Sequence, residues 1–148
     1  MCLSTDEKYT ELIEAINSLD CKEDIIEVQN KEKDDIITAI MDKYVVGNPR
    51  VWWLAFKKNP ISFSYDDEFQ YQRINQFFYD DEVCFLITEL ETIHVFKLSV
   101  RNIIKVLGEC SFFEYYITDL KFQNLLCETD HGDLLYMFYL CNFTNRVN

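Results

Sequence analysis

The spacing of apolar residues changes near position 49, and this change constrains the fold more than any other feature of the sequence. Before it, apolar residues recur on one helical face over residues 5–19 and again over residues 31–44, and Gly47-Asn48-Pro49 ends the second run. After it, the apolar residues form short runs rich in β-branched and aromatic types, which favour strands. Helices followed by mostly sequential strands predict an α+β fold, with an antiparallel sheet of about four to six strands packed against amphipathic helices, two of them N-terminal.

Local signals define the expected elements. Thr5 is the expected N-cap of the first helix, and Ser99 is that of a later helix that ends at Leu107 before Gly108. Residues 133–141 are apolar nearly throughout and fit either a helix or a strand, and we favour the helix. The other expected elements are strands at residues 51–56, 83–88 and 92–98, a short helix within residues 66–78, and a closing hairpin at residues 112–118 and 122–127.

Charge and aromatic content together indicate what the surface and the core are made of. The 148 residues include 26 acidic and 14 basic side chains, a net charge of −12, together with 12 Phe, 9 Tyr and 2 Trp. That aromatic area is enough for a folded core, and the length suits a single domain, residues 1–148. A negative surface repels phosphates, so direct binding to nucleic acid or to an anionic membrane is not expected, and a basic protein is the expected partner.

The sequence carries no recognisable targeting signal or cofactor motif. No basic segment followed by an apolar stretch opens the chain, and no window approaches the roughly 20 apolar residues that cross a bilayer, so we expect a cytoplasmic protein. The six cysteines are widely spaced and form no Cys-x-x-Cys pair, which favours free thiols over a zinc site. Glycine-rich phosphate loops and nucleophile elbows are absent, so no cofactor is expected.

Three acidic clusters are the main candidates for a binding surface. They are Glu32/Asp34/Asp35, Asp66-Asp67-Glu68 and Asp80-Asp81-Glu82, and tyrosines flank the last two. Tyrosines beside carboxylates suit an interface with Lys and Arg on the other side, although any one cluster also fits a solvated turn. The expected partner-binding residues are Tyr65, Asp66, Asp67, Glu68, Tyr71, Tyr79, Asp80, Asp81 and Glu82.

The adjacent Trp52 and Trp53 are a further candidate anchor. On a strand their rings point to opposite faces of the sheet, so one enters the core. The other is either covered by helices, which we favour, or exposed as a binding anchor.

Two alternative interpretations remain open at this point. Glu128, Asp130 and Asp133 surround His131, which suits the divalent metal or general base of a metal-assisted hydrolase. No established metal-ligand spacing is formed, however, and a polar turn explains the cluster equally well, so we expect no catalytic residue and no metal ligand. The acidic surface also fits an adaptor or a DNA-mimicking regulator, in which carboxylates copy the spacing of phosphates. His94, the other histidine, is expected to be an ordinary strand residue.

Three segments carry a resemblance to a known class of proteins: Trp52-Trp53, Phe113-Glu114-Tyr115-Tyr116-Ile117 and Leu125-Leu126-Cys127-Glu128-Thr129-Asp130-His131. They resemble small bacterial immunity proteins of contact-dependent inhibition and other polymorphic-toxin systems. In that pattern an acidic residue directly follows the histidine, whereas here Gly132 stands between His131 and Asp133. The resemblance implies a binding protein that neutralises a toxin domain, with no catalytic residues to carry over. Many such toxins act on nucleic acid and are basic around the cleft, so an acidic inhibitor suits them.

Overall fold

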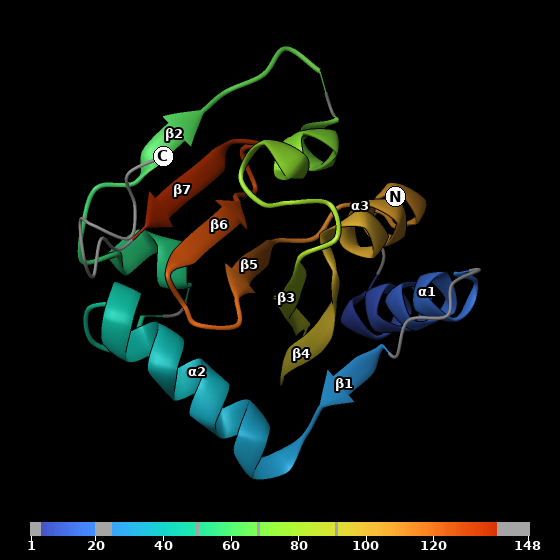
Figure 1. Cartoon of the computed structure of the whole chain (residues 1–148), viewed down its shortest axis with the longest axis horizontal. Helices are drawn as coiled ribbons and strands as arrows, with labels where there is room; N and C mark the ends of the chain where they lie inside the picture. Colours follow the sequence, from blue (N-terminus) through green and yellow to red (C-terminus); the bar gives the residue numbers. More distant parts are fainter. Residues whose placement is uncertain (1–3, 20–24, 50, 68, 91, 139–148) are drawn as a thin grey trace.

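A single antiparallel sheet of seven strands organises the computed structural model, which describes residues 4–19, 25–49, 51–67, 69–90 and 92–138. The strand order is β1-β4-β3-β5-β6-β7-β2 (Figure 1). The fold is therefore α+β, as the sequence predicts. The elements are α1 (Thr5–Asn17), β1 (Ile26–Val28), α2 (Asn30–Tyr44), η1 (Trp52–Ala55), β2 (Ile61–Phe63), η2 (Gln70–Gln76), β3 (Val83–Leu90), β4 (Thr92–Ser99), α3 (Val100–Glu109), β5 (Tyr115–Asp119), β6 (Asn124–Glu128) and β7 (Leu134–Phe138).

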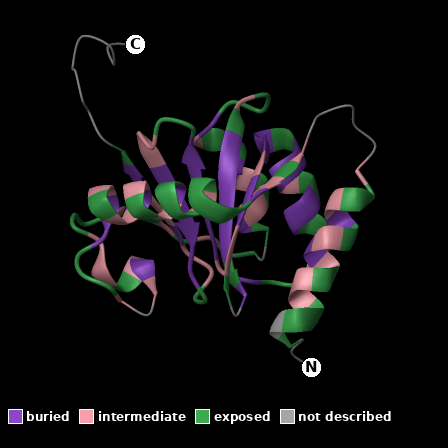
Figure 2. Ribbon diagram, turned by 90° about the horizontal axis from the view of Figure 1, so that it is seen from below, coloured by how far each residue is buried: buried purple, intermediate pink, exposed green. Residues whose placement is uncertain are grey.

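Helices cover both faces of the sheet, so the protein has two apolar layers. On one face α1, α3 and η2 pack against the sheet, through residues such as Leu12, Ile103 and Ile74. On the other face α2 and η1 supply a second cluster that includes Ile40 and Trp52. Side chains of consecutive strand residues point to opposite faces, so both enter an apolar layer. Figure 2 shows the buried strand segments enclosed between helices.

Several predicted boundaries agree with the structure. Helix α2 and the β3–β4 hairpin lie where the sequence places them, and β5 pairs with β6 as the expected closing hairpin. Ser99 is the N-cap of α3, and its hydroxyl accepts a hydrogen bond from the Asn102 amide at 3.4 Å. No helix within the described ranges combines the length and the apolar composition that a membrane span requires.

Other predictions are wrong, and local chemistry explains why. Ser4, in place of Thr5, is the N-cap of α1, because its hydroxyl accepts a hydrogen bond from the Glu7 amide and the Glu7 carboxylate accepts one from the Ser4 amide, which is a capping box. Helix α3 continues through Gly108 to Glu109, since a glycine inside a helix costs only about 1 kcal/mol. The expected helix over residues 133–141 is instead strand β7 as far as Phe138, and the rest of that range lies outside the described residues.

The segments at residues 51–56, which contain the two tryptophans, and at residues 66–78 also differ from expectation. Residues 52–55 form the 3-10 helix η1 where a strand was predicted, and the predicted helix in residues 66–78 is a 3-10 helix from Gln70 to Gln76. The rings of Trp52 and Tyr116 lie 4.8 Å apart, so Trp52 packs in the core. Trp53 is half-buried, and its indole Nε1 donates a hydrogen bond to Glu114 Oε2 at 2.5 Å.

Candidate functional site

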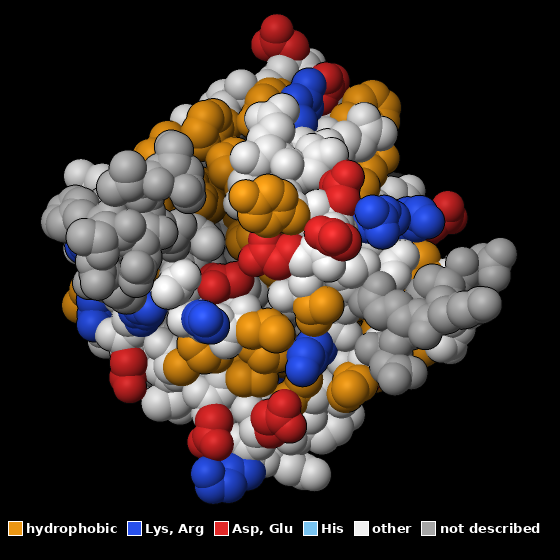
Figure 3. Space-filling model, in the orientation of Figure 1, with side chains coloured by type: hydrophobic (Ala, Val, Ile, Leu, Met, Phe, Trp, Pro, Cys, Tyr) orange, Lys and Arg blue, Asp and Glu red, His pale blue; other side chains and the backbone are white. Residues whose placement is uncertain are grey.

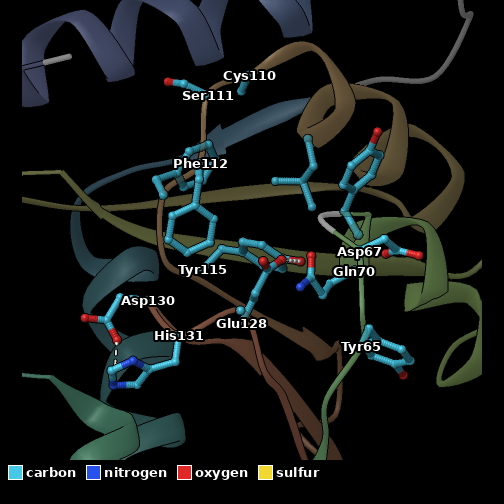
Figure 4. A pocket seen from close by; sticks show the side chains of 14 residues that line it. Tyr65, Asp67, Gln70, Cys110, Ser111, Phe112, Tyr115, Glu128, Asp130 and His131 are labelled. Atoms are coloured by element: carbon cyan, nitrogen blue, oxygen red, sulfur yellow. Dashed lines mark hydrogen bonds and ion pairs between the residues drawn. The ribbon is translucent and has the colours of Figure 1, made fainter. Parts of the chain in front are cut away.

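A pocket of about 600 Å³ opens between the start of η2, the C-terminal end of α3 and the hairpin β5–β6 (Figure 4). Aromatic side chains form part of its wall, and several polar side chains also line it. Phe112 and Phe113 come from the loop that follows α3, and Tyr71 from η2. Tyr115, Glu128 and Gln70 supply polar groups deep in the pocket wall, and the lining also includes Asp67, Ser111, Asp130 and His131. Pockets of this size, with apolar walls and a few placed polar groups, are typical of small-molecule sites.

Strand register places Glu128 directly opposite Tyr115. The two residues pair across β5 and β6, and the Tyr115 hydroxyl donates a hydrogen bond to Glu128 Oε1 at 2.6 Å. Glu128 is only 6% exposed. Burial raises the pKa of the Glu128 carboxyl, and the hydrogen bond from Tyr115 opposes that rise. Burial also raises the pKa of Tyr115 well above its ordinary value, so the hydroxyl remains a donor.

Gln70 and Gly132 close one side of the pocket. Gln70 is the first residue of η2 and is 7% exposed. Gly132 lies in the turn between β6 and β7, with φ +82, and a Cβ at this position would stand 3.0 Å from Gln70 Nε2. The glycine thus allows both the left-handed turn and the close approach of the Gln70 amide.

The pocket lining is acidic. Asp67, Glu128 and Asp130 line it, and no Lys or Arg is among its lining residues in the described part of the chain. Asp67 lies at the rim and forms two hydrogen bonds with the guanidinium of Arg73, each at 2.9 Å. This pairing lowers the pKa of Asp67 to about 2, with a further contribution from the Phe69 amide. The Arg73 guanidinium also stacks over the Tyr65 ring, 4.1 Å from its centroid.

The four residues of the hydrolase interpretation do not converge on one metal position. Glu128 points into the pocket toward Tyr115, whereas His131 Nε2 faces Asp130 Oδ1 at 3.5 Å near the surface. Asp133 Oδ1 instead accepts a hydrogen bond from the Ser64 hydroxyl at 2.7 Å. Across the ranges that the structure describes, no three His, Cys, Asp or Glu side chains are grouped so that they could hold a metal ion.

A second acidic feature, the acidic turn (residues 79–82), lies beyond the opposite end of η2 from the pocket. Tyr79 and Glu82 border a groove of about 450 Å³, together with Asn75, Asp119 and Asn124. Figure 3 shows the face seen in Figure 1, and carboxylates gather near its middle, where Figure 1 draws the segment that leads into β3. Lys and Arg side chains lie around them.

The structure therefore divides the predicted partner-binding residues into two groups. Tyr65, Asp67 and Tyr71 line the pocket, whereas Tyr79 and Glu82 border the groove. Asp66, Asp80 and Asp81 are exposed, and Glu68 lies outside the described residues. The third acidic cluster is on α2, where Asp35 pairs with Lys31 at 3.0 Å. Sequence reasoning missed Gln70, and it missed the role of Tyr115 because the predicted hairpin ends at Cys127, one residue before the Glu128 with which Tyr115 pairs.

The replacement Glu128→Gln is expected to change how stability depends on pH. The pKa of Glu128 in the folded protein is raised above the ordinary 4.5, so the folded state binds more protons than the unfolded state in the window above 4.5. Raising the pH through that window therefore lowers the free energy of unfolding. Glutamine does not ionise and its Oε1 still accepts from Tyr115, so the variant is expected to be more stable than the native protein at neutral pH.

Urea denaturation of both proteins at about pH 4.5 and about pH 8 measures this effect. The other carboxyl groups are common to both proteins. The difference between their free energies of unfolding therefore changes with pH only through Glu128. A difference in unfolding free energy that is the same at both pH values would contradict the prediction.

Comparison with known proteins identifies one family. Residues 9–144 match the sequence pattern of DUF6756, which is described as a family of unknown function. Comparison with curated proteins and with solved structures finds no match.

Proposed function

The chain belongs to DUF6756, a family of unknown function, and on this premise we propose that it is an immunity protein that binds and neutralises a cognate bacterial toxin domain. The toxin domain is basic and of the nuclease type, and the protein acts by covering its active surface. This role needs binding and no catalysis. It also requires an acidic contact surface, whose charges are available to the partner because the protein's own cations do not neutralise them.

The observation that carries the proposal is the state of the acidic turn. Tyr79 is 80% exposed. Within the described ranges, no Lys or Arg forms an ion pair with the carboxylates of Asp80, Asp81 or Glu82. The turn is nevertheless held in place, because the Tyr79 amide donates to Glu82 Oε1 at 3.2 Å and the Arg101 amide donates to the Asp80 carbonyl at 2.8 Å. The backbone of the turn is therefore held in place, and its carboxylates are available to a cationic surface.

The groove beside the acidic turn supplies the other half of an interface. Its lining combines aromatic rings, such as Phe77 and Tyr136, with the side-chain amides of Gln76 and Gln123. Aromatic anchors give affinity when a partner buries them, and amides hydrogen-bond at the rim. Charge on the turn would raise the rate of encounter with a basic partner, and the groove would then slow dissociation.

The segments that resemble immunity proteins also support the proposal by where they lie. Residues 113–117 and 125–131 are distant from residues 52–53 in sequence, but the three segments pack together. The rings of Trp52 and Tyr116 contact each other at a tilt, with centroids 4.8 Å apart, and the Trp53 indole donates a hydrogen bond to Glu114. The rings of Trp53 and His131 meet edge to face with centroids 6.2 Å apart. The shared residues thus form one connected unit of the fold.

The product of the gene directly upstream is the partner to test. We expect it to arrest growth when it is expressed alone, and co-expression of this chain to restore growth. With the purified proteins, the association rate is expected to fall steeply as NaCl is raised, because salt screens charges beyond about 8–10 Å. The double variant D80N/D81N should slow association by roughly tenfold at low salt.

A matched control separates the position of the charges from their number. The double variant E32Q/D34N removes two exposed carboxylates from α2, so its net charge equals that of D80N/D81N. It should associate at nearly the native rate. The proposal is wrong if the upstream product neither harms cells nor binds. Equal slowing by the two double variants, or an association rate indifferent to salt, would remove the acidic turn from the interface.

A further inference from the structure

The aromatic pocket at Glu128 is separate from the acidic turn, and its chemistry selects a different ligand. We propose that it binds a small organic cation with N–H donors, an amine, amidine or guanidine, through the free oxygen of Glu128 and the side-chain amide of Gln70. The pocket lies at the N-terminal end of η2 and the acidic turn beyond its C-terminal end, so this site is independent of the proposed docking surface.

Gln70 is the first observation that points to a ligand. The residue is only 7% exposed, and the described residues offer its side-chain amide no hydrogen bond. In the described structure, every side-chain nitrogen or oxygen that is fully buried has a hydrogen-bond partner. The Gln70 amide has none, so its polar atoms are not fully buried and must reach the open space of the pocket. Figure 4 shows it directed toward Glu128. A buried amide without a protein partner costs stability unless water or a ligand bonds to it.

Glu128 supplies the charge that selects a cation. Tyr115 bonds only to Oε1, which leaves Oε2 as an acceptor facing the pocket. Burial disfavours the ionised carboxylate, and a cation placed against Oε2 would stabilise it. Figure 4 draws the Gln70 side chain next to that of Glu128, so its carbonyl oxygen would accept a second N–H from a planar amidinium or guanidinium group bound at Glu128.

The walls and the charge of the pocket fit the same class of ligand. Phe112, Phe113 and Tyr71 offer aromatic faces, which attract cations. Asp67 is paired with Arg73 at the rim, so Glu128 and Asp130 supply the remaining negative charge, and no Lys or Arg is among the described lining residues; anions such as phosphates and carboxylates are therefore disfavoured. The volume of about 600 Å³ accommodates a compact organic molecule.

Three probes of nearly identical shape test the proposal: benzamidine, a cation; benzamide, its neutral counterpart; and benzoate, an anion. Binding is measured by chemical-shift titration of the ¹⁵N-labelled full chain. Benzamidine is expected to saturate with a dissociation constant below about 1 mM and to bind at least about tenfold more tightly than benzamide, while benzoate does not bind. Shifts should be concentrated at residues 70, 115, 128 and 132.

Variants identify the groups responsible. Glu128→Gln keeps the acceptor for Tyr115 and removes only the charge, so it should abolish the preference for benzamidine over benzamide. Gln70→Leu should weaken benzamidine several-fold. Glu32→Gln, which removes an exposed carboxylate on α2, should change nothing, and neither should D80N/D81N. Far-ultraviolet circular dichroism tests whether each variant is folded.

The proposal is overturned if benzamidine fails to saturate at about 10 mM, if benzamide or benzoate binds as well as benzamidine, or if Glu128→Gln retains the preference. Should Glu128→Gln fail to fold, Gln70→Leu decides, since unchanged affinity there contradicts the proposed contact. None of these outcomes depends on a toxin partner, so this inference and the immunity proposal succeed or fail separately.

Discussion

Replacing Phe96 with alanine is expected to lower the free energy of unfolding by about 3–5 kcal/mol. Phe96 is 1% exposed and belongs to the apolar layer between the sheet and helices α1 and α3, with Leu12 and Ile103 in the same cluster. Deleting the ring removes its transfer free energy and leaves a cavity that neighbours on two helices and a central strand cannot fill. Urea denaturation followed by tryptophan fluorescence measures the loss.

Phe112→Ala is the matched control for this experiment. It deletes the same ring from a loop residue that is 46% exposed. We expect its cost to stay below about 1 kcal/mol, since surface substitutions are usually close to neutral. Losses of similar size in the two variants would mean that the layer under α1 and α3 is not packed as described.

Replacing Asp119 with alanine is expected to cost about 2–3 kcal/mol. Asp119 ends β5, is 8% exposed, and its Oδ1 accepts hydrogen bonds from the amides of Gln123 and Asn124 at 2.7 and 2.8 Å. These bonds fix the turn into β6, in which Phe122 has φ +59, a conformation that a non-glycine residue adopts only when its surroundings enforce it. Alanine leaves both amides without their acceptor.

Asp119→Asn separates the hydrogen bonds from the charge. Asparagine keeps Oδ1 as an acceptor, so its unfolding free energy should remain within about 1 kcal/mol of the native value. Equal denaturation midpoints for the alanine and asparagine variants would show that the two amides find other partners, and would contradict the role given to Oδ1.

The parts of the fold that the sequence predicts are those with strong local signals. The stripe of α2 stands out because one face of the helix meets solvent, and the apolar run of β3 has turns on either side. Strand β7 was misassigned because it is covered on both sides. Leu134 packs in the layer under α1 and α3, whereas Leu135 and Met137 pack on the side of α2, so the alternation that marks a strand is absent.

Other features depend on contacts between distant residues and leave no local signal. The run that begins at Trp52 has the composition of a strand, but it forms a 3-10 turn in which the Trp52 ring packs against Tyr116 of the sheet and the Trp53 amide donates to the Tyr116 hydroxyl. The site shows the same limit. Tyr65, Tyr71 and Tyr79 are close in sequence, yet η2 separates Tyr79 from the pocket. Gln70 becomes notable only in the folded structure, where it is buried in the pocket wall and Gly132 approaches its amide.

The two outermost strands have a consequence for how this protein meets other molecules. Strands β1 and β2 contain three residues each, and together they form the margins of the whole sheet. A margin this short is a poor template for an incoming chain, which discourages fibrous self-assembly. It also disfavours capture of an extended peptide through main-chain pairing, so selectivity must come from side-chain chemistry on turns and helices.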